Sequence, residues 1–387
     1  MKRAFLFIIS LVLSFSFLSV SKAKFVCVAE NDNVSLAKNA KSAILMDANS
    51  DFVLFEKNSD ERLPIASMTK MMSLSIIFDE IEKESINLED KVTISENAAQ
   101  TEGSQAFLDA NKTYLVKDLL KSIIISSAND STVALSEAVA GNETEFVRKM
   151  NSKAKELNLV NTHFENSTGL SANEHYSSAK DCAIIYKEIM DNPIYLEYSK
   201  IWMTDLIHPS GRRTELVNTN RLVKTYPGCD SGKTGYTSLA KYCLTCSARR
   251  GETRLVGVVI GEPDSKTRFS EVREMFDYGF ANYKSNVVLD KDEFSAEIDI
   301  FNGKIDKIYG KIENSYSILT KNGEKLNVKV IIEDNDPRAP IEVGDVIGKV
   351  LVVDENGVVI FEDEILANEA VAKMQFFDHF KHILNHW

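Results

Sequence analysis

Three short motifs in this chain of 387 residues supply the side chains that a serine acyl-transfer site requires. In chain order they are Ser67-Met68-Thr69-Lys70, Ser127-Ala128-Asn129 and Lys233-Thr234-Gly235. The first two patterns recur elsewhere in the chain, so the sequence around each motif has to identify the copies that do chemistry. In this order the motifs indicate a nucleophilic serine, a lysine that takes its proton, and further groups that bind substrate.

The first motif supplies the nucleophile and its base. Ser67 follows Leu63-Pro64-Ile65-Ala66 and opens a helical pattern, so Ser67 and Lys70 lie on one helical face. A serine hydroxyl is a poor nucleophile, and a lysine amine accepts its proton only when burial or a neighbouring cation lowers the pKa of the amine. We therefore expect Ser67 to be the nucleophile and Lys70 the base. The alternative is that Ser67 only caps the helix.

The second motif stands where an apolar helix ends. Residues 119–126 are mostly apolar, and the sequence Ser-Ala-Asn-Asp after them is a natural break that projects polar side chains into a cleft. We expect Ser127 to relay a proton between Lys70 and the leaving amine, and Asn129 to hold the substrate amide and Lys70. The alternative is that both residues only cap helices.

The third motif precedes a predicted strand. Gly235 lets a substrate backbone lie beside the edge of that strand, which orients the bond to be cleaved. Lys233 and Thr234 offer a cation and a hydroxyl to a substrate carboxylate, and the charge of Lys233 also helps to keep the base neutral. We expect the backbone N–H groups of Ser67 and Tyr236 to form an oxyanion hole.

Composition excludes several classes of protein. The chain has 45 basic and 57 acidic side chains, and its net charge of −12 repels phosphate backbones, so we expect no nucleic-acid partner. With 44% hydrophobic and 26% charged residues it is globular and long enough for two domains. We find no internal repeat and expect no metal or organic cofactor.

The N-terminus predicts export. Met1-Lys2-Arg3 is followed by an apolar run, Ala4 to Val20, and then by Ser21-Lys22-Ala23, which places small residues at positions −3 and −1 of a cleavage site. We therefore predict a signal peptide over residues 1–23 and an exported protein. The alternative is an N-terminal membrane helix.

The five cysteines are an odd number and do not indicate a disulfide scaffold. Cys243 and Cys246 have the spacing of a metal or redox pair, but they fall in a predicted strand, where residues three apart point to opposite faces. We therefore expect them to be small buried hydrophobic side chains.

Residues 24–284 mix strand and helix patterns and predict an α+β domain. A hairpin is expected from Ser42–Asp47 and Phe52–Glu56, and strands return at Lys241–Arg249 and Thr253–Ile260. The first hairpin and the last strands are expected to share one antiparallel sheet. Helical periodicity covers the intervening and final parts of this domain: Met68–Glu82, Leu115–Ala140, Glu143–Leu157 and Glu271–Tyr283.

The C-terminal part predicts a small all-β domain over residues 285–364 and a helix over residues 365–387. Asn302-Gly303, Asn322-Gly323 and Asn356-Gly357 favour tight hairpin turns, and Lys325–Val330 alternates like a half-buried strand. In residues 365–387 the apolar side chains, three Phe and a terminal Trp among them, fall on one helical face. We expect this helix to bind a membrane surface; the alternative is packing against the β domain.

The motifs and the phrases around them resemble the serine-type D-alanyl-D-alanine carboxypeptidases, the low-molecular-mass penicillin-binding proteins. The resemblance covers about residues 40–283, and the β domain and final helix resemble the stalk and anchor of that family. The phrases that carry it are Ile44–Ala48, Pro64–Lys70, Ser126–Asp130, Thr162–Asn166, Thr168–Leu170 and Gly232–Thr237.

The resemblance implies the penicillin-binding-protein/β-lactamase-like transpeptidase fold, with an antiparallel sheet and helices. It implies removal of the terminal D-Ala from peptidoglycan stem peptides that end in D-Ala-D-Ala, through an acyl-enzyme on Ser67, and acylation by beta-lactams. The other motif residues take the roles given above. Arg268 lies in a segment similar to the one whose arginine, in the family, helps to bind the terminal carboxylate.

Three alternatives remain open on the sequence. A class A β-lactamase shares the motifs but needs a glutamate that activates the deacylating water, and Glu165-Asn166 occupies roughly the right interval. Endopeptidase action on cross-links depends on how large a substrate the cleft admits. A non-catalytic envelope scaffold has no need of a desolvated lysine beside a serine.

Overall fold

A five-stranded antiparallel sheet is the frame that positions the three motifs in the computed structural model, which describes residues 34–375. The sheet has the strand order β2-β1-β9-β8-β7, so the N-terminal hairpin and the later strands share one sheet, as predicted. The motif Lys233-Thr234-Gly235 lies in β7, at the edge of the sheet. The strands are β1 (Ser42–Asp47), β2 (Val53–Lys57), β7 (Cys229–Thr237), β8 (Lys241–Arg250) and β9 (Thr253–Glu262).

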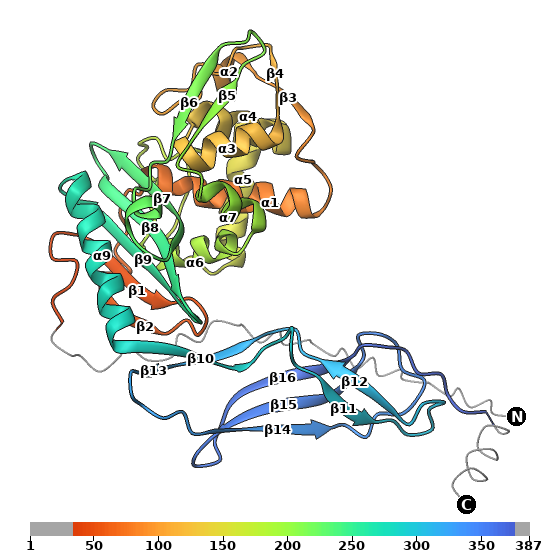
Figure 1. Ribbon diagram of the computed structural model, residues 1–387. Helices are drawn as coiled ribbons and strands as arrows, with labels where there is room; N and C mark the ends of the chain where they lie inside the picture. The colour runs from red at the N-terminus through yellow and green to blue at the C-terminus, as the bar shows by residue number, and fades with distance from the viewer. Residues whose placement is uncertain (1–33, 376–387) are drawn as a thin grey trace, which may run out of the picture.

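The central strands are buried on both faces because helices cover both sides of the sheet. Every residue of β1 and β9 is buried, which explains their continuous apolar sequences. On one face lies α9 (Ser265–Asn282), whose Phe276 ring approaches Gly257 so closely that an added Cβ would be 3.2 Å from it. The sheet and α9 lie side by side in Figure 1.

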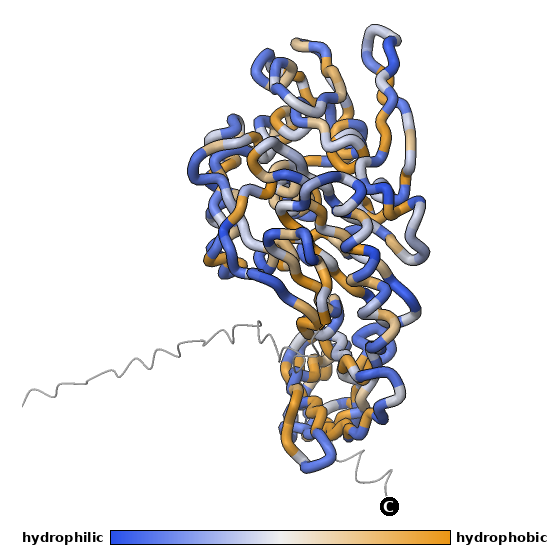
Figure 2. The backbone as a smooth tube through the Cα atoms, turned by 90° about the vertical axis from the view of Figure 1, so that its left-hand side faces the viewer, coloured by the Kyte–Doolittle hydropathy of each residue, from blue (hydrophilic) through white to orange (hydrophobic). Residues whose placement is uncertain are grey.

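The opposite face of the sheet packs against the helical region that carries the other two motifs (Figure 1). Apolar segments run through the interior of this region in Figure 2. The helical periodicity over 115–140 is confirmed, and it is broken at Ser127 as predicted. The main elements are η1 (Ala66–Thr69), α1 (Lys70–Glu82), α3 (Val116–Ser126), α4 (Asn129–Ala140), α5 (Glu143–Glu156), α6 (Ala179–Met190) and α7 (Pro193–Ser199).

Short elements complete the N-terminal part of the described chain, residues 34–282. Two small hairpins project from the helical region, and two short helices flank them. They are β3 (Lys91–Thr93) with β4 (Thr113–Leu115), β5 (Met203–Ile207) with β6 (Arg213–Val217), α2 (Glu96–Ala99) and α8 (Leu222–Thr225).

The C-terminal part is an all-β domain, as the sequence predicted. A two-stranded ribbon leads from the N-terminal part into a five-stranded sheet with the order β11-β12-β16-β15-β14 and its own apolar core. The strands are β10 (Tyr283–Leu289), β11 (Ala296–Asp299), β12 (Lys307–Lys311), β13 (Tyr316–Lys321), β14 (Val328–Asp334), β15 (Val346–Asp354) and β16 (Val359–Ala367).

Two details of this domain differ from the prediction. Asn322-Gly323 does not close a hairpin, because β13 pairs with β10 and β14 pairs with β15. The strand predicted at Lys325–Val330 begins only at Val328, and β14 is largely exposed because it lies at an edge of the sheet. Local alternation reveals a strand, but the position of that strand in its sheet depends on its partners.

The prediction of a helix that starts at Ile365 is wrong for its first residues. Ile365 belongs to β16, which continues to Ala367, and Val371 then pairs with Ile341. Cross-strand pairing and burial in the β-domain core override the helical pattern there. The rest of the predicted helix, from residue 376, and the predicted signal peptide lie outside the described residues.

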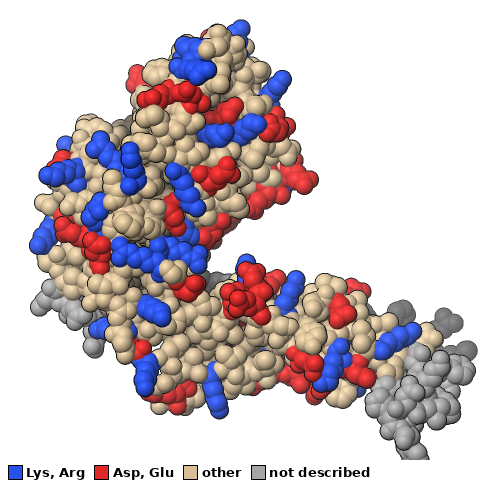
Figure 3. Space-filling model, in the orientation of Figure 1, with Lys and Arg blue, Asp and Glu red and all other residues tan. Residues whose placement is uncertain are grey.

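Two further expectations concern membranes and cysteines. Within residues 34–375, no helix is both long and apolar enough to span a bilayer. Cys243 and Cys246 lie in β8, and their side chains join separate apolar cores on opposite faces of the sheet, as predicted. Lys and Arg are interspersed with Asp and Glu over the face in Figure 3.

Candidate active site

The first motif forms a close contact between Ser67 and Lys70 at the junction of η1 and α1. Lys70 Nζ lies 3.0 Å from Ser67 Oγ, 2.6 Å from Asn129 Oδ1 and 2.7 Å from the Thr168 carbonyl oxygen. The Lys70 side chain has no exposed surface. Burial and, next, the charge of Lys233 hold the pKa of the Lys70 amine well below its usual value, and Asp130 opposes them.

The arrangement around Lys70 suits a neutral amine. A neutral amine has two N–H bonds and one lone pair, and two carbonyl oxygens, those of Asn129 and Thr168, accept the two N–H bonds. The lone pair is then left to face the Ser67 hydroxyl. Lys70 is therefore oriented to accept a proton from Ser67.

The second motif turns the chain between two helices. Ser127 has left-handed backbone angles, φ 65° and ψ 32°, and caps α3, while Asn129 begins α4. Its position lets Ser127 Oγ accept a hydrogen bond from Lys233 Nζ at 2.7 Å. Asn129 Oδ1 accepts a hydrogen bond from Lys70 Nζ, and Asn129 Nδ2 donates one to the Glu102 carbonyl oxygen at 2.5 Å.

The third motif lies along the edge strand β7. Lys233 is buried, and burial together with Arg268 lowers the pKa of its amine to about 7. Gly235 lies against η1: an added Cβ would be 2.5 Å from the Ile65 carbonyl oxygen. Thr234 is buried, whereas Tyr236 is 55% exposed and its ring packs at a tilt against that of Tyr242, 4.4 Å between centroids.

Arg268 lies behind β7 and contacts the third motif through the backbone. Its Nη1 donates to the carbonyl oxygens of Gly235 and Cys243, each at 3.2 Å, from the first turn of α9. Burial lowers the pKa of its guanidinium to about 10. The structure therefore brings all nine predicted site residues to one place: Ser67, Lys70, Ser127, Asn129, Lys233, Thr234, Gly235, Tyr236 and Arg268.

Sequence reasoning missed the loop that supplies the second carbonyl to Lys70. Asn166 Oδ1 accepts hydrogen bonds from the backbone N–H groups of Thr168 and Gly169, at 3.2 and 2.7 Å. Gly169 has φ +85°, and an added Cβ would be only 1.9 Å from the Ala66 carbonyl oxygen. The phrase Thr168-Gly169-Leu170 was a usable signal, because a tight backbone approach requires glycine.

Asp130 and His175 are further buried groups that the motifs did not reveal. The Asp130 carboxylate accepts the backbone N–H groups of Ala106 and Leu108, each at 3.0 Å, and so fixes a loop beside Asn129. His175 Nε2 lies 2.7 Å from Thr69 Oγ1, and burial lowers the pKa of the imidazole to about 4, so it is neutral at pH 7.

Glu165 does not have the surroundings of a residue that activates water. It is exposed, and its carboxylate accepts the backbone N–H of Glu174 at 2.9 Å. It lies in the same loop as Thr168, but the atom of that loop that contacts Lys70 is the Thr168 carbonyl oxygen. This geometry speaks against the class A β-lactamase alternative.

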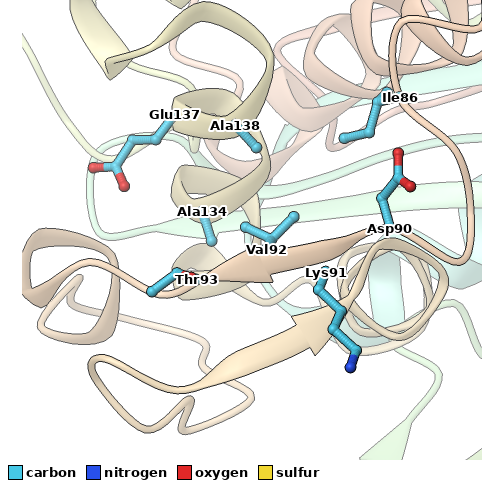
Figure 4. A pocket seen from close by; sticks show the side chains of 8 residues that line it. All are labelled: Ile86, Asp90, Lys91, Val92, Thr93, Ala134, Glu137 and Ala138. Atoms are coloured by element: carbon cyan, nitrogen blue, oxygen red, sulfur yellow. The ribbon is translucent and has the colours of Figure 1, made fainter.

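A large pocket lies away from these residues. It measures about 520 Å³ between β3 and α4. Figure 4 shows its lining, which contains none of the predicted site residues. The candidate site is therefore the motif cluster, where a serine, a lysine of lowered pKa and hydrogen-bond donors meet.

Comparisons with known proteins match both halves of the chain. The family described as D-alanyl-D-alanine carboxypeptidase matches residues 28–264, and the family described as penicillin-binding protein 5, C-terminal domain, matches residues 283–373.

Individual relatives cover most of the chain. The chain is 41% identical to D-alanyl-D-alanine carboxypeptidase DacF of Bacillus subtilis over 354 residues, 91% of each protein. It is 35% identical to D-alanyl-D-alanine carboxypeptidase DacA of Haemophilus influenzae over 322 residues, 81% of this chain and 80% of the relative. The crystal structure of penicillin binding protein 5 from Haemophilus influenzae superposes with a TM-score of 0.70 at 32% identity, covering 88% of this chain and 99% of that one.

Replacing Gly169 with Ala tests whether the close backbone approach at the site is required. Gly169→Ala is expected to lower the free energy of unfolding by about 3 kcal/mol or more, because strain at positive φ adds to a backbone clash. Gly211→Ala is the matched control, since Gly211 has φ +84° and open space around it, and we expect a loss of only about 1 kcal/mol. Urea unfolding measures both, and equal losses would contradict the interpretation.

Proposed function

Because this chain belongs to the D-alanyl-D-alanine carboxypeptidase family, we propose that Ser67 attacks the carbonyl of the penultimate D-Ala of a peptidoglycan stem peptide and that the terminal D-Ala leaves. The single observation that carries this assignment is the buried Lys70 amine, whose Nζ lies 3.0 Å from Ser67 Oγ. The enzyme is a serine hydrolase that acts in cell-wall metabolism.

Acylation begins with proton transfer from Ser67 to Lys70. As the Ser67 oxygen bonds to the carbonyl carbon, its proton moves to the lone pair of the Lys70 amine, and the substrate oxygen becomes an oxyanion. The backbone N–H groups of Ser67 and Tyr236 are proposed to stabilise this oxyanion. Asn129 keeps Lys70 aligned through Oδ1.

Collapse of the tetrahedral intermediate needs a proton on the departing amine. Lys233 Nζ donates to Ser127 Oγ, so the hydroxyl proton of Ser127 is free to point into the cleft. We propose that Ser127 gives this proton to the D-Ala nitrogen and recovers one from protonated Lys70. Water then attacks the ester with Lys70 again taking a proton, and Lys70 returns this proton to the Ser67 oxygen as the trimmed stem peptide is released.

The terminal carboxylate is proposed to bind at the β7 end of the cluster. Lys233 supplies a charge and Thr234 a hydroxyl, while Arg268 adds positive charge from behind and fixes Gly235 through its carbonyl oxygen. Beta-lactams carry a carboxylate and a strained amide, so they are proposed to use the same groups and to acylate Ser67.

We also propose the organisation of the whole chain. Residues 1–23 are a signal peptide, residues 24–284 the catalytic domain, residues 285–375 the β domain, and residues 376–387 a segment that binds the membrane surface. Phe376, Phe377, Phe380, Ile383, Leu384 and Trp387 supply its apolar side. The enzyme then works at the outer face of the cytoplasmic membrane as a peripheral protein.

Labelling with a fluorescent penicillin tests the nucleophile and the reaction class. We expect an adduct that peptide mass spectrometry maps to Ser67 and that decays slowly after the free label is removed, together with release of D-Ala from a D-Ala-D-Ala peptide. Ser67→Ala should lose both activities, whereas Ser126→Ala, one residue from the second motif, should retain them. Release of D-Ala by Ser67→Ala at the wild-type rate would contradict the assignment of Ser67 as the nucleophile. Loss of the adduct within seconds would favour a β-lactamase.

The pH dependence of kcat/KM tests the two lysines. The value of kcat/KM should fall at low pH because Lys70 accepts a proton only when it is neutral. Because the pKa of Lys70 is lowered, this acid limb should lie well below the pKa of a free lysine. It should also fall above about pH 7, where Lys233 loses the charge that binds the carboxylate. Lys233→Arg keeps a cation at high pH, so the alkaline limb should move upward. An unmoved limb would contradict the role of Lys233.

Removal of residues 376–387 tests the membrane proposal. The full chain should sediment with lipid vesicles and the truncated chain should not, while both are labelled equally by penicillin. Because Lys381 is the segment's single Lys or Arg, added salt should change vesicle binding little. Equal sedimentation of the two chains would refute the proposal.

A further inference from the structure

A buried histidine joins the two segments of chain that meet at Lys70. His175 is 5% exposed and contacts Thr69, the residue before Lys70. Its Nε2 lies 2.7 Å from Thr69 Oγ1, and its Nδ1 accepts a hydrogen bond from the backbone N–H of Glu165 at 3.2 Å. Glu165 begins the loop whose Thr168 carbonyl oxygen contacts Lys70. One imidazole ring therefore links η1 to this loop.

The two hydrogen bonds fix the protonation state of the ring. A backbone N–H can only donate, so Nδ1 of His175 carries a lone pair. The proton of the neutral ring is then on Nε2, which donates to Thr69 Oγ1. Burial lowers the pKa of the imidazole to about 4, with smaller effects of Glu165, which raises it, and of His163 and Lys70, which lower it. A protonated ring would turn an N–H toward each partner and lose the bond from Glu165.

The loop that begins at Glu165 is a compact turn. Asn166 Oδ1 accepts the backbone N–H groups of Thr168 and Gly169, at 3.2 and 2.7 Å. At the far end of the turn, a Cβ added to Gly169 would be 2.8 Å from Thr69 Oγ1. The Thr69 hydroxyl therefore lies close to the turn as well as to the imidazole. The position of the Thr168 carbonyl oxygen thus depends on the imidazole at the start of the turn and on Thr69 at its end.

The imidazole acts on the base indirectly. The neutral Lys70 amine has two N–H bonds, and the Thr168 carbonyl oxygen accepts one of them at 2.7 Å. A shift of this carbonyl would let the amine rotate and turn its lone pair away from Ser67. Among the hydrogen bonds found in residues 34–375, none joins His175 to Ser67 or to Lys70. The ring therefore orients the base and exchanges no proton with the nucleophile.

We propose that His175 is a positioning residue whose neutral imidazole holds the Thr168 carbonyl oxygen on the Lys70 amine. The inference rests on the proposed function and adds a residue that sets the orientation of the base. Its effect falls on the rate of acylation, because bond formation needs an aligned lone pair, and not on the noncovalent binding that precedes it.

Three substitutions separate the hydrogen bonds of His175 from its volume. His175→Gln keeps a donor for Thr69, and His175→Asn keeps an acceptor for Glu165. His175→Phe keeps only a ring that packs against Phe164. With penicillin as the probe, His175→Phe should lower the acylation rate constant about tenfold or more and change the dissociation constant of the noncovalent complex less than about twofold. The Gln and Asn variants should each lose less, since each keeps one link.

The order of the variants distinguishes positioning from packing. If the imidazole only filled space, His175→Phe would be the mildest change and His175→Asn the most harmful. That order, or a wild-type acylation rate in His175→Phe, overturns the inference. His163→Phe is the matched control, since His163 lies in the same loop and its Nδ1 bonds to the Glu174 carbonyl oxygen at 2.6 Å. It should acylate at the wild-type rate, and a loss equal to that of His175→Phe would also contradict the inference.

NMR of the imidazole nitrogens tests the protonation state without any substitution. In the wild-type chain with isotope-labelled histidine, the signal of His175 is recognised by its contact with the Phe164 ring. It should show a neutral ring at pH 7 with the proton on Nε2, and should remain so down to about pH 4. A proton on Nδ1, or a charged ring at pH 7, would overturn the inference. A wild type that neither releases D-Ala nor reacts with penicillin refutes the proposed function instead.

Discussion

The removal of the Lys70 ammonium from water is the constraint on which the rest of the site depends. A fully buried amine beside a second buried amine cannot hold a full positive charge at low free-energy cost, so its pKa falls well below its usual value. The same burial requires partners for its N–H bonds, and the carbonyl oxygens of Asn129 and Thr168 provide them. Desolvation and hydrogen bonding together therefore produce an oriented base.

The fold satisfies this constraint because three segments of the chain surround the Lys70 side chain. The edge strand β7 presents Lys233 from one side, the start of α4 presents Asn129 from another, and the loop at Thr168 covers the third. Close approach between these segments is possible where glycine removes a Cβ, as at Gly169 and Gly235 against the backbone of residues 65 and 66. The close backbone packing therefore also produces the burial that lowers the pKa of Lys70.

Positive groups gather at the β7 side of the site, where Lys233 is buried and Arg268 lies behind the strand and donates to the Gly235 carbonyl oxygen. The β domain extends from the N-terminal half of the chain through the β10–β13 ribbon (Figure 1).

The sequence by itself determined the side chains of the three motifs and the first hairpin, because periodicity and side-chain chemistry are local properties, whereas the order of the strands in the main sheet and the place of the third motif within β7 came from the tertiary structure. Only the tertiary structure decided that Thr168 supplies a carbonyl oxygen to Lys70 and that Glu102 supplies one to Asn129, since any residue type can offer a backbone carbonyl and no motif marks it. Tertiary structure also decided the conformation of Ile365. Its local pattern favoured a helix, but pairing between β15 and β16 places it in a strand.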